Sequence, residues 1–184
     1  MAGPKNVAFR GIQDCQIAKL TADTESALTY DSLVDVAIQK LSFSANIDTY
    51  ELKHDDLTQE IDQVTQSYDV KGTIARVNLD VLAVFTGSTV SASGSGDAEI
   101  QTFDQQYDDD PNYFKLEIQS TRAFATDGVP GDVHVLFPKV KVTDLEVTIE
   151  DGFATIDFTG KAVRAINTGT IKEIIVNETE TAIS

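Results

Sequence analysis

The chain has 184 residues, of which 30 are acidic and 14 are basic, so its formal net charge is −16. This length suits one domain, 1–184, with a genuine hydrophobic core. A surface this acidic repels nucleic acid and anionic membranes, and sequence-reading binding of DNA or RNA is close to excluded. The single cysteine, Cys15, excludes an intrachain disulfide and a cysteine-rich zinc site.

The chain also lacks the sequence features of membrane insertion and secretion. No stretch approaches the roughly 18 consecutive apolar residues of a membrane helix. The segment Met1–Lys5 lacks the apolar run of a signal peptide. We therefore expect a protein that is made and folded in a cytoplasm and does not enter a membrane.

Short alternating apolar runs predict strands in the N-terminal half. Residues 12–20 and 70–76 are each expected to form a strand, and segment 1–11 is a candidate extended arm. In 33–52 the apolar phase changes twice, which is typical of two strands or of one long bent strand.

One segment, 78–87, predicts a helix. Asn78 can cap its start, Asp80 lies in its first turn, and Gly87 can end it. Three apolar residues fall on one helical face, although the apolar residues also alternate, so a strand is the alternative.

Two stretches are predicted to be long loops. Segment 55–69 contains five acidic residues and no lysine or arginine, and segment 88–110 combines a Ser/Gly run with Asp108–Asp110. Loops of this length inside a compact domain usually have a function or are disordered.

The C-terminal half predicts a meander of antiparallel strands, beginning with 113–125. Pro138 is followed by a change in apolar phase, which indicates a bulge or an edge position. Further strands are expected at 145–149, 153–167 and 171–178. The core is expected to include Phe114, Leu116, Ile118, Val135, Phe137, Phe153, Ile156 and Phe158.

A search for chemistry finds no catalytic constellation. His54 and His134 lack metal-ligand spacing; a solvated loop position is expected for the first and a half-buried or surface strand position for the second. Cys15 is expected to act as a small buried apolar residue. Segment 108–112 offers oxygen atoms of the kind that calcium prefers, but it lacks the glycine and distal glutamate of an EF-hand, so a solvated acidic turn is expected. No catalytic residue, metal site or cofactor is predicted, and the chain is not expected to be an enzyme.

Two adjacent stretches carry a resemblance to a known family. Val133–Val142, which reads VHVLFPKVKV, and Gly152–Val163, which reads GFATIDFTGKAV, resemble the late strands of phage major tail proteins, which build tail tubes. The mid-chain helix at 78–87 and the charged segment between two early strands are similar as well.

The resemblance implies a fold and a function. The fold would be mainly β, an antiparallel two-sheet sandwich or barrel with one flanking short helix and long loops. Six subunits would form a ring, and stacked rings would form a tube in the virion tail, assembled in the host cytoplasm. The acidic lumen would conduct DNA without holding it. Partners would be further copies of the chain and other tail proteins, such as tape measure, terminator and baseplate components.

The composition fits that implication independently. A conduit for a polyanion should not neutralise phosphates, because each such contact releases counterions and adds affinity. Strand edges, which are otherwise an aggregation hazard, would be paired by neighbours in a closed ring.

Two sets of site residues follow from this reading. Leu57, Ile61 and Val64 are apolar residues in an acidic segment and are predicted to contact the next ring. Asp48, Glu51 and Asp69 are predicted to face the lumen. The alternative is an acidic β-sandwich binding or adhesion module, with calcium as one option for its ligand, and an enzyme ranks third.

Overall fold

The computed structural model describes residues 9–54, 57–122, 131–149, 151–177 and 180–183. Within these residues the chain is mainly β, with one short α-helix. The elements in chain order are β1 (Phe9–Thr24), β2 (Ala27–Tyr30), β3 (Val34–Asp35), β4 (Ile38–His54), β5 (Leu57–Ile74), α1 (Leu79–Thr86), β6 (Thr89–Ser93), the 3₁₀ turn η1 (Gly96–Ala98), β7 (Ile100–Asp104), β8 (Tyr113–Arg122), β9 (Asp132–Thr148), β10 (Thr155–Ala162) and β11 (Glu173–Val176).

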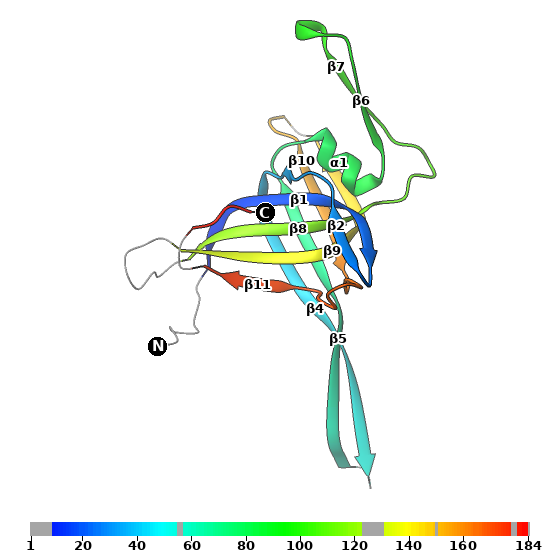
Figure 1. Ribbon diagram of the computed structural model, residues 1–184, viewed down its shortest axis with the longest axis vertical. Coiled ribbons are helices and arrows are strands. Elements are labelled where there is room, and N and C mark those ends of the chain that lie inside the picture. Colours follow the sequence, from blue (N-terminus) through cyan, green and yellow to red (C-terminus); the bar gives the residue numbers. More distant parts are fainter. Residues whose placement is uncertain (1–8, 55–56, 123–130, 150, 178–179, 184) are drawn as a thin grey trace.

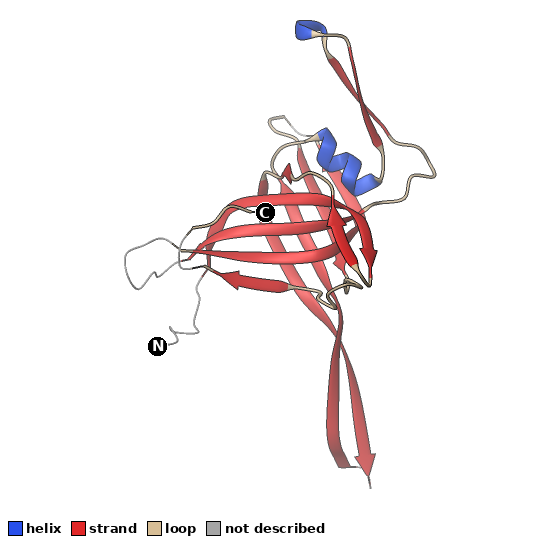
Figure 2. Ribbon diagram, in the orientation of Figure 1, coloured by secondary structure: helices blue, strands red, loops and turns tan. Residues whose placement is uncertain are grey.

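The described strands form one large curled antiparallel sheet and one small one. The large sheet has nine strands in the order β2-β1-β8-β9-β10-β5-β4, with β11 paired to β9 and β3 paired to β1. We call β1, β8, β11 and the first part of β9 the front half, and β10, β5, β4 and the last part of β9 the back half. The strands of the two halves run across each other (Figures 1 and 2). This confirms the predicted sandwich or barrel with one flanking helix.

Strand β9 belongs to both halves because it bends at a bulge. Leu116 pairs with Phe137 and Phe114 pairs with Val140, so β9 carries one extra residue around Pro138. A bulge bends a strand and shifts its side-chain alternation by one, which explains the change in apolar phase. The predicted bulge is therefore confirmed, as is the β8-β9-β10 meander, although β11 returns to β9 instead of continuing it.

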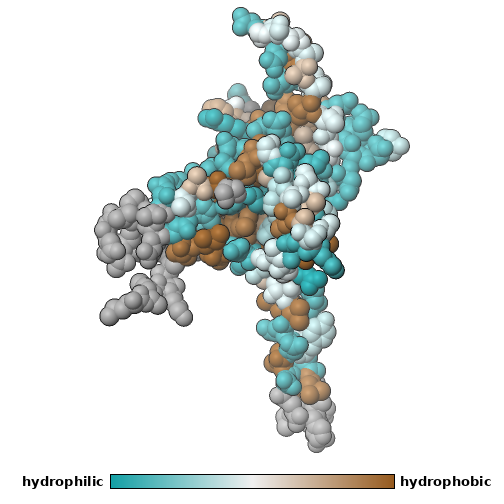
Figure 3. All heavy atoms as spheres, viewed as in Figure 1, coloured by the Kyte–Doolittle hydropathy of each residue, from teal (hydrophilic) through white to brown (hydrophobic). Residues whose placement is uncertain are grey.

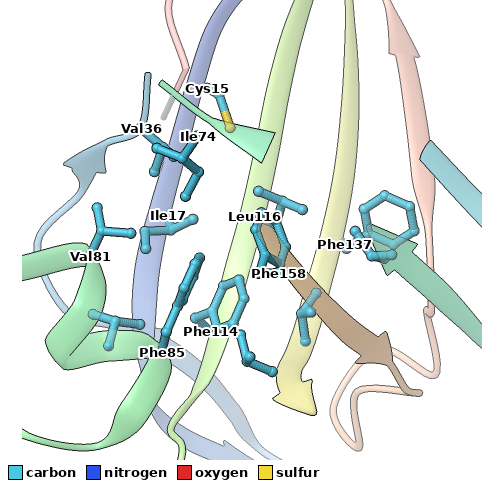
Figure 4. Close-up of a cluster of buried hydrophobic side chains, with 14 of the residues drawn as sticks. Cys15, Ile17, Val36, Ile74, Val81, Phe85, Phe114, Leu116, Phe137 and Phe158 are labelled. Carbon is cyan, nitrogen blue, oxygen red and sulfur yellow. The ribbon is translucent and has the colours of Figure 1, made fainter. Parts of the chain in front are cut away.

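Helix α1 closes one end of the space between the halves. Asn78 caps it by accepting a 2.9 Å hydrogen bond from the Asp80 amide, and Gly87 ends it at φ 81°. Phe85 lies between the two halves, with its ring centroid 5.1 Å from that of Phe114 and 4.9 Å from that of Phe158 (Figure 4). The predicted helix and its two caps are thus confirmed.

The predicted core is confirmed except at one position. Phe153 is 87% exposed because β10 begins only at Thr155, which leaves Phe153 in the turn before the strand. The residues that are buried as predicted are Phe114, Leu116, Ile118, Val135, Phe137, Ile156 and Phe158.

The two predicted long loops are wrong, because both regions form hairpins. Strand β5 occupies 57–74 and pairs with β4 along its whole length, while β6 and β7 form a separate hairpin within 88–110. Most of the described strand residues in these two segments are exposed. Their sequences therefore show only weak apolar alternation, which would otherwise indicate a buried strand face. In the candidate arm 1–11, residues 9–11 belong to β1, and residues 1–8 lie outside the described residues.

Candidate assembly surfaces

We call the two packed halves of the large sheet, together with α1, the body. The β4–β5 hairpin has one end in the body and the other end in solvent. Near the body, the Phe43 ring packs against the rings of Tyr68 and Phe137. The Asn46 side chain then donates hydrogen bonds of 3.1 Å to Ser67 Oγ and 2.8 Å to Asp69 Oδ1. Beyond this point the hairpin projects away from both halves of the sheet (Figure 1).

The projecting part exposes apolar side chains on both of its faces. Strand β5 carries an extra residue opposite the step from Asn46 to Ile47, and the pairing is regular from there to Leu52. Paired residues share a face, and successive residues alternate between faces. Tyr50, Leu52 and Val64 therefore lie on one face, and Ile47 and Ile61 lie on the other; all five are exposed. Figure 3 shows hydrophobic residues scattered among polar ones along the hairpin.

The residues predicted to contact the next ring do not form one stripe. Ile61 is 57% exposed and Val64 is 43% exposed, but they lie on opposite faces of β5. Leu57 is the first residue of β5, and its side chain lies outside the described residues. These apolar positions therefore belong to a two-sided hairpin and not to the loop that the sequence indicated.

The residues predicted to face a lumen are not brought together either. Asp48 lies on the same face of β4 as Ser44, which pairs with Asp69, whereas Glu51 lies on the opposite face. Asp48 and Glu51 are three residues apart in a regular strand, so they cannot line one surface. The structure thus separates Glu51 from the other two predicted positions.

A broad polar surface, which the sequence analysis missed, covers the outward face of the back half. Four strands contribute alternate residues to it, and the inward residues between them, such as Val70 and Phe158, are buried. Thr73 donates a 2.5 Å hydrogen bond to Asp157 across the β5–β10 pair. Lysines and acids occur in equal number among its charged residues, Lys40, Asp69, Lys71, Lys141, Asp144, Glu146, Asp157 and Lys161. The period-two pattern of these strands was a signal for the outward residues of each strand, but not for which strands lie side by side.

Several strand edges are unpaired within the described part of the chain. Strand β11 pairs only with β9, and β4 pairs only with β5. The side chains of Ile174, Ile175 and Val176 on β11 are all exposed. Unpaired edges with apolar side chains offer a template for another chain.

A buried polar cluster lies on the outward face of the front half. Its central residue is His134, which is 4% exposed and sits between Glu117 and Asp132. The expected half-buried or surface position of His134 was wrong. The sequence shows polar residues on this face but not the C-terminal segment that covers it.

The sequence analysis also considered Cys15, the acidic turn 108–112 and His54 as candidates for chemistry. Cys15 is buried as predicted, and burial, with a smaller contribution from Asp14, raises the pKa of its thiol to about 12. In the acidic turn, Asp109 accepts a 2.8 Å hydrogen bond from the Gln106 amide, and Asp110 pairs with Lys141 at 2.8 Å. No group of three or more His, Cys, Asp or Glu among the described residues is arranged to hold a metal ion. The side chain of His54 lies outside the described residues.

Neither protein-family models nor curated proteins give a match for this chain. No helix in the described part is both long enough and apolar enough to cross a membrane. Any function assigned to the chain therefore rests on the assembly surfaces themselves.

Proposed function

We propose that this protein is the structural subunit of a phage tail tube, which assembles with copies of itself into stacked rings. The observation that carries the proposal is the projecting β4–β5 hairpin with exposed apolar side chains on both faces. A two-stranded hairpin is marginally stable in water by itself. Apolar burial contributes roughly 25 cal/mol per Å², so contact with neighbouring copies would stabilise this hairpin.

The strand edges supply a second, independent argument for closed assembly. Strand β11 at one border of the sheet and β4 at another present different surfaces. Contact between different surfaces of identical copies is heterologous, and it generates a ring when the rotation closes. We propose that ring formation pairs these edges and covers Ile174 and its apolar neighbours on β11.

The outward polar face of the back half is our candidate for the lining of the bore. It replaces the hairpin acids because it is continuous over four strands and its charged residues balance. Lysines surrounded by carboxylates neutralise few phosphates, so DNA would gain little affinity for such a wall. The charge of −16 on each chain would further disfavour retention of a polyanion. Other tail proteins would then contact the two ends of the tube.

The first test is the state of the concentrated protein by size-exclusion chromatography and electron microscopy. Wild-type protein is expected to form rings or tubes. A protein that stays monomeric or dimeric at every concentration would contradict the proposal and favour an acidic binding module.

The second test removes the hairpin cleanly. Residues 47–66 are replaced by Asn-Gly, which joins the paired residues Asn46 and Ser67 through a two-residue turn. The variant is expected to fold with the far-ultraviolet spectrum of a β protein but to form no tubes. Thr49→Ala with Gln63→Ala, a polar pair on the same hairpin, is the matched control and should assemble normally. Tubes formed by the shortened variant would remove the hairpin from the assembly mechanism.

A further inference from the structure

The C-terminal residues Asn177 and Glu180–Ile183, which we call the strap, lie over the outward face of the front half. In Figure 1 the C-terminal segment lies close to β1, next to β8. Gln119 of β8 donates a 2.9 Å hydrogen bond to the Thr181 carbonyl, and Gln13 of β1 donates to the Glu180 carboxylate. Ile183 is buried. The strap is therefore attached by polar contacts and one apolar side chain.

Asp132 is the main attachment point of the strap. Its side chain is fully buried, and its backbone carbonyl accepts a 3.0 Å hydrogen bond from the Asn177 amide. Its Oδ2 atom accepts from the Thr181 amide at 2.8 Å, the Thr181 hydroxyl at 3.3 Å and Gln119 Nε2 at 2.7 Å. A buried carboxylate needs such donors, because an unpaired charge out of water is costly.

His134 supplies a further donor to Asp132 Oδ2 and a compensating charge, whereas Oδ1 of Asp132 has no hydrogen-bond partner among the described residues. Its Nε2 lies 3.0 Å from Asp132 Oδ2, and its Nδ1 lies 2.8 Å from Glu117 Oε1. Both ring nitrogens thus face carboxylate oxygens, and only the doubly protonated ring donates to both. Lys115 Nζ lies 3.3 Å from the other oxygen of Glu117, so among the described residues of this cluster two cations face two carboxylates.

Among the described residues, the groups around His134 come from β8, β9, β11, β2 and the strap. Strand β8 contributes Lys115 and Glu117, and β9 contributes Asp132. Strand β11 places Ile175 opposite His134, and β2 places the Tyr30 ring over the Lys115 ammonium group at 5.5 Å. On the strap, Glu180 carries a charge, but its carboxylate accepts from Gln13.

We propose that His134 is a pH-dependent latch that holds the strap on the body while its ring is doubly protonated. When the ring loses one proton, one of its nitrogens becomes an acceptor facing a carboxylate, and the cluster keeps an uncompensated buried negative charge. Opening the strap relieves this state, because water then reaches Asp132. The strap is therefore closed in neutral solution and opens as the solution becomes alkaline. This latch belongs to the folded subunit and does not depend on the proposed function.

The direction of the pH dependence follows from the shifted pKa values of His134 and Asp132. Burial lowers the pKa of His134, but its hydrogen bonds to Glu117 and Asp132 outweigh burial and raise it above its ordinary value. The His134 contribution is thus complete below a pH of about 6.5 and is lost as pH rises through the raised pKa. Burial raises the pKa of Asp132, but hydrogen bonds from Thr181, His134 and the neighbouring amides outweigh burial and lower it far below its ordinary value. The Asp132 contribution is present above the ordinary carboxyl pKa and is lost as pH falls through the lowered pKa.

The experiment measures hydrogen exchange of the strap amides in full-length protein by mass spectrometry. Rates are divided by those of a synthetic peptide of residues 177–184 at the same pH, which removes the intrinsic pH dependence of exchange. We expect the protection factor to be constant up to near-neutral pH and then to fall as the pH rises through the raised pKa of His134. A protection factor that stays constant to pH 10 would overturn the proposal, and this readout needs no variant.

Two variants assign the effect to His134. His134→Gln is expected to give low, pH-independent strap protection, because the amide cannot donate to both carboxylates as an imidazolium does. His54→Gln removes the other histidine and should leave the wild-type profile unchanged. A wild-type profile in a folded His134→Gln protein, or its loss in His54→Gln, would contradict the assignment.

Discussion

Strands β4 and β5 pass through two very different environments. At the body end, Val70 and Ile74 are fully buried between the halves, and Phe43 packs against other aromatic rings. At the far end, the same two strands keep their pairing but expose Tyr50, Leu52 and Ile61. The comparison separates two sources of order: the body is stabilised by its own core, whereas the described residues of the projecting hairpin are paired through their backbones and form no core of their own.

The largest expected effect is the destabilisation of the body when a core side chain is removed. Phe158→Ala should lower the free energy of unfolding by about 3–5 kcal/mol, because a buried ring that contacts Phe85 is removed and a cavity remains. That is a large share of the roughly 5–15 kcal/mol available to a domain. Urea unfolding at a concentration too low for assembly measures it. Phe153→Ala is the matched control, and a large loss there would contradict the exposed position of Phe153.

A smaller effect is expected at the end of α1. Gly87 has φ 81°, and a Cβ there would lie 2.1 Å from the Asp110 carbonyl oxygen. Gly87→Ala should therefore destabilise the body by about 1–3 kcal/mol through backbone strain, with additional loss from the clash. Gly169 has φ 70°, but a Cβ there would meet no atom of a non-neighbouring residue within 4 Å, so Gly169→Ala should cost less. Equal losses in thermal unfolding of the two variants would show that the contact with Asp110 does not matter.

Substitutions in the projecting hairpin should affect assembly and leave the stability of the subunit nearly unchanged. Ile61→Ser with Val64→Ser should change the free energy of unfolding of the dilute subunit by less than about 1 kcal/mol, because both side chains are already exposed. The same variant should assemble less than the wild type in light scattering of concentrated protein. A strong loss of subunit stability with normal assembly would reverse the comparison between body and hairpin.

The smallest effect is expected in the acidic turn. Asp109→Ala removes a partly exposed carboxylate that accepts a hydrogen bond from the Gln106 amide, so the melting temperature of the variant should stay close to that of the wild type. Calcium should not change the melting temperature of either protein. Calcium stabilisation that Asp109→Ala abolishes would instead support the binding-module alternative.

The sequence predicted those parts of the fold that leave a local pattern. The caps of α1 at Asn78 and Gly87, the bulge at Pro138 and the alternation around Phe114 each have a short-range physical cause. The outer part of β5 was missed because neither face of the projecting hairpin is buried among the described residues, so no period-two apolar pattern marks it; the paired part of β4 lay within the strand or strands predicted over 33–52. Burial of His134 was missed because the strap that covers it is far away in the sequence.

The candidate site was predicted less well than the fold. The predicted lumen residues in 48–69 were chosen without regard to the alternation of side chains along a strand. This alternation alone places Asp48 and Glu51 on opposite faces. The polar face of the back half depends on which four strands lie side by side. That order arises from long-range pairing, which a single sequence does not state.

The bulge in β9 also has a mechanical consequence. Its 17 residues pair with β8 in one half of the sheet and with β10 in the other, so one continuous backbone connects the two halves. Tension along this backbone is carried by covalent bonds and is shared among many hydrogen bonds loaded in parallel. Tension applied across the edge of β11 would instead break its few pairing bonds one after another. The molecule therefore resists stretching along β9 more strongly than peeling at β11.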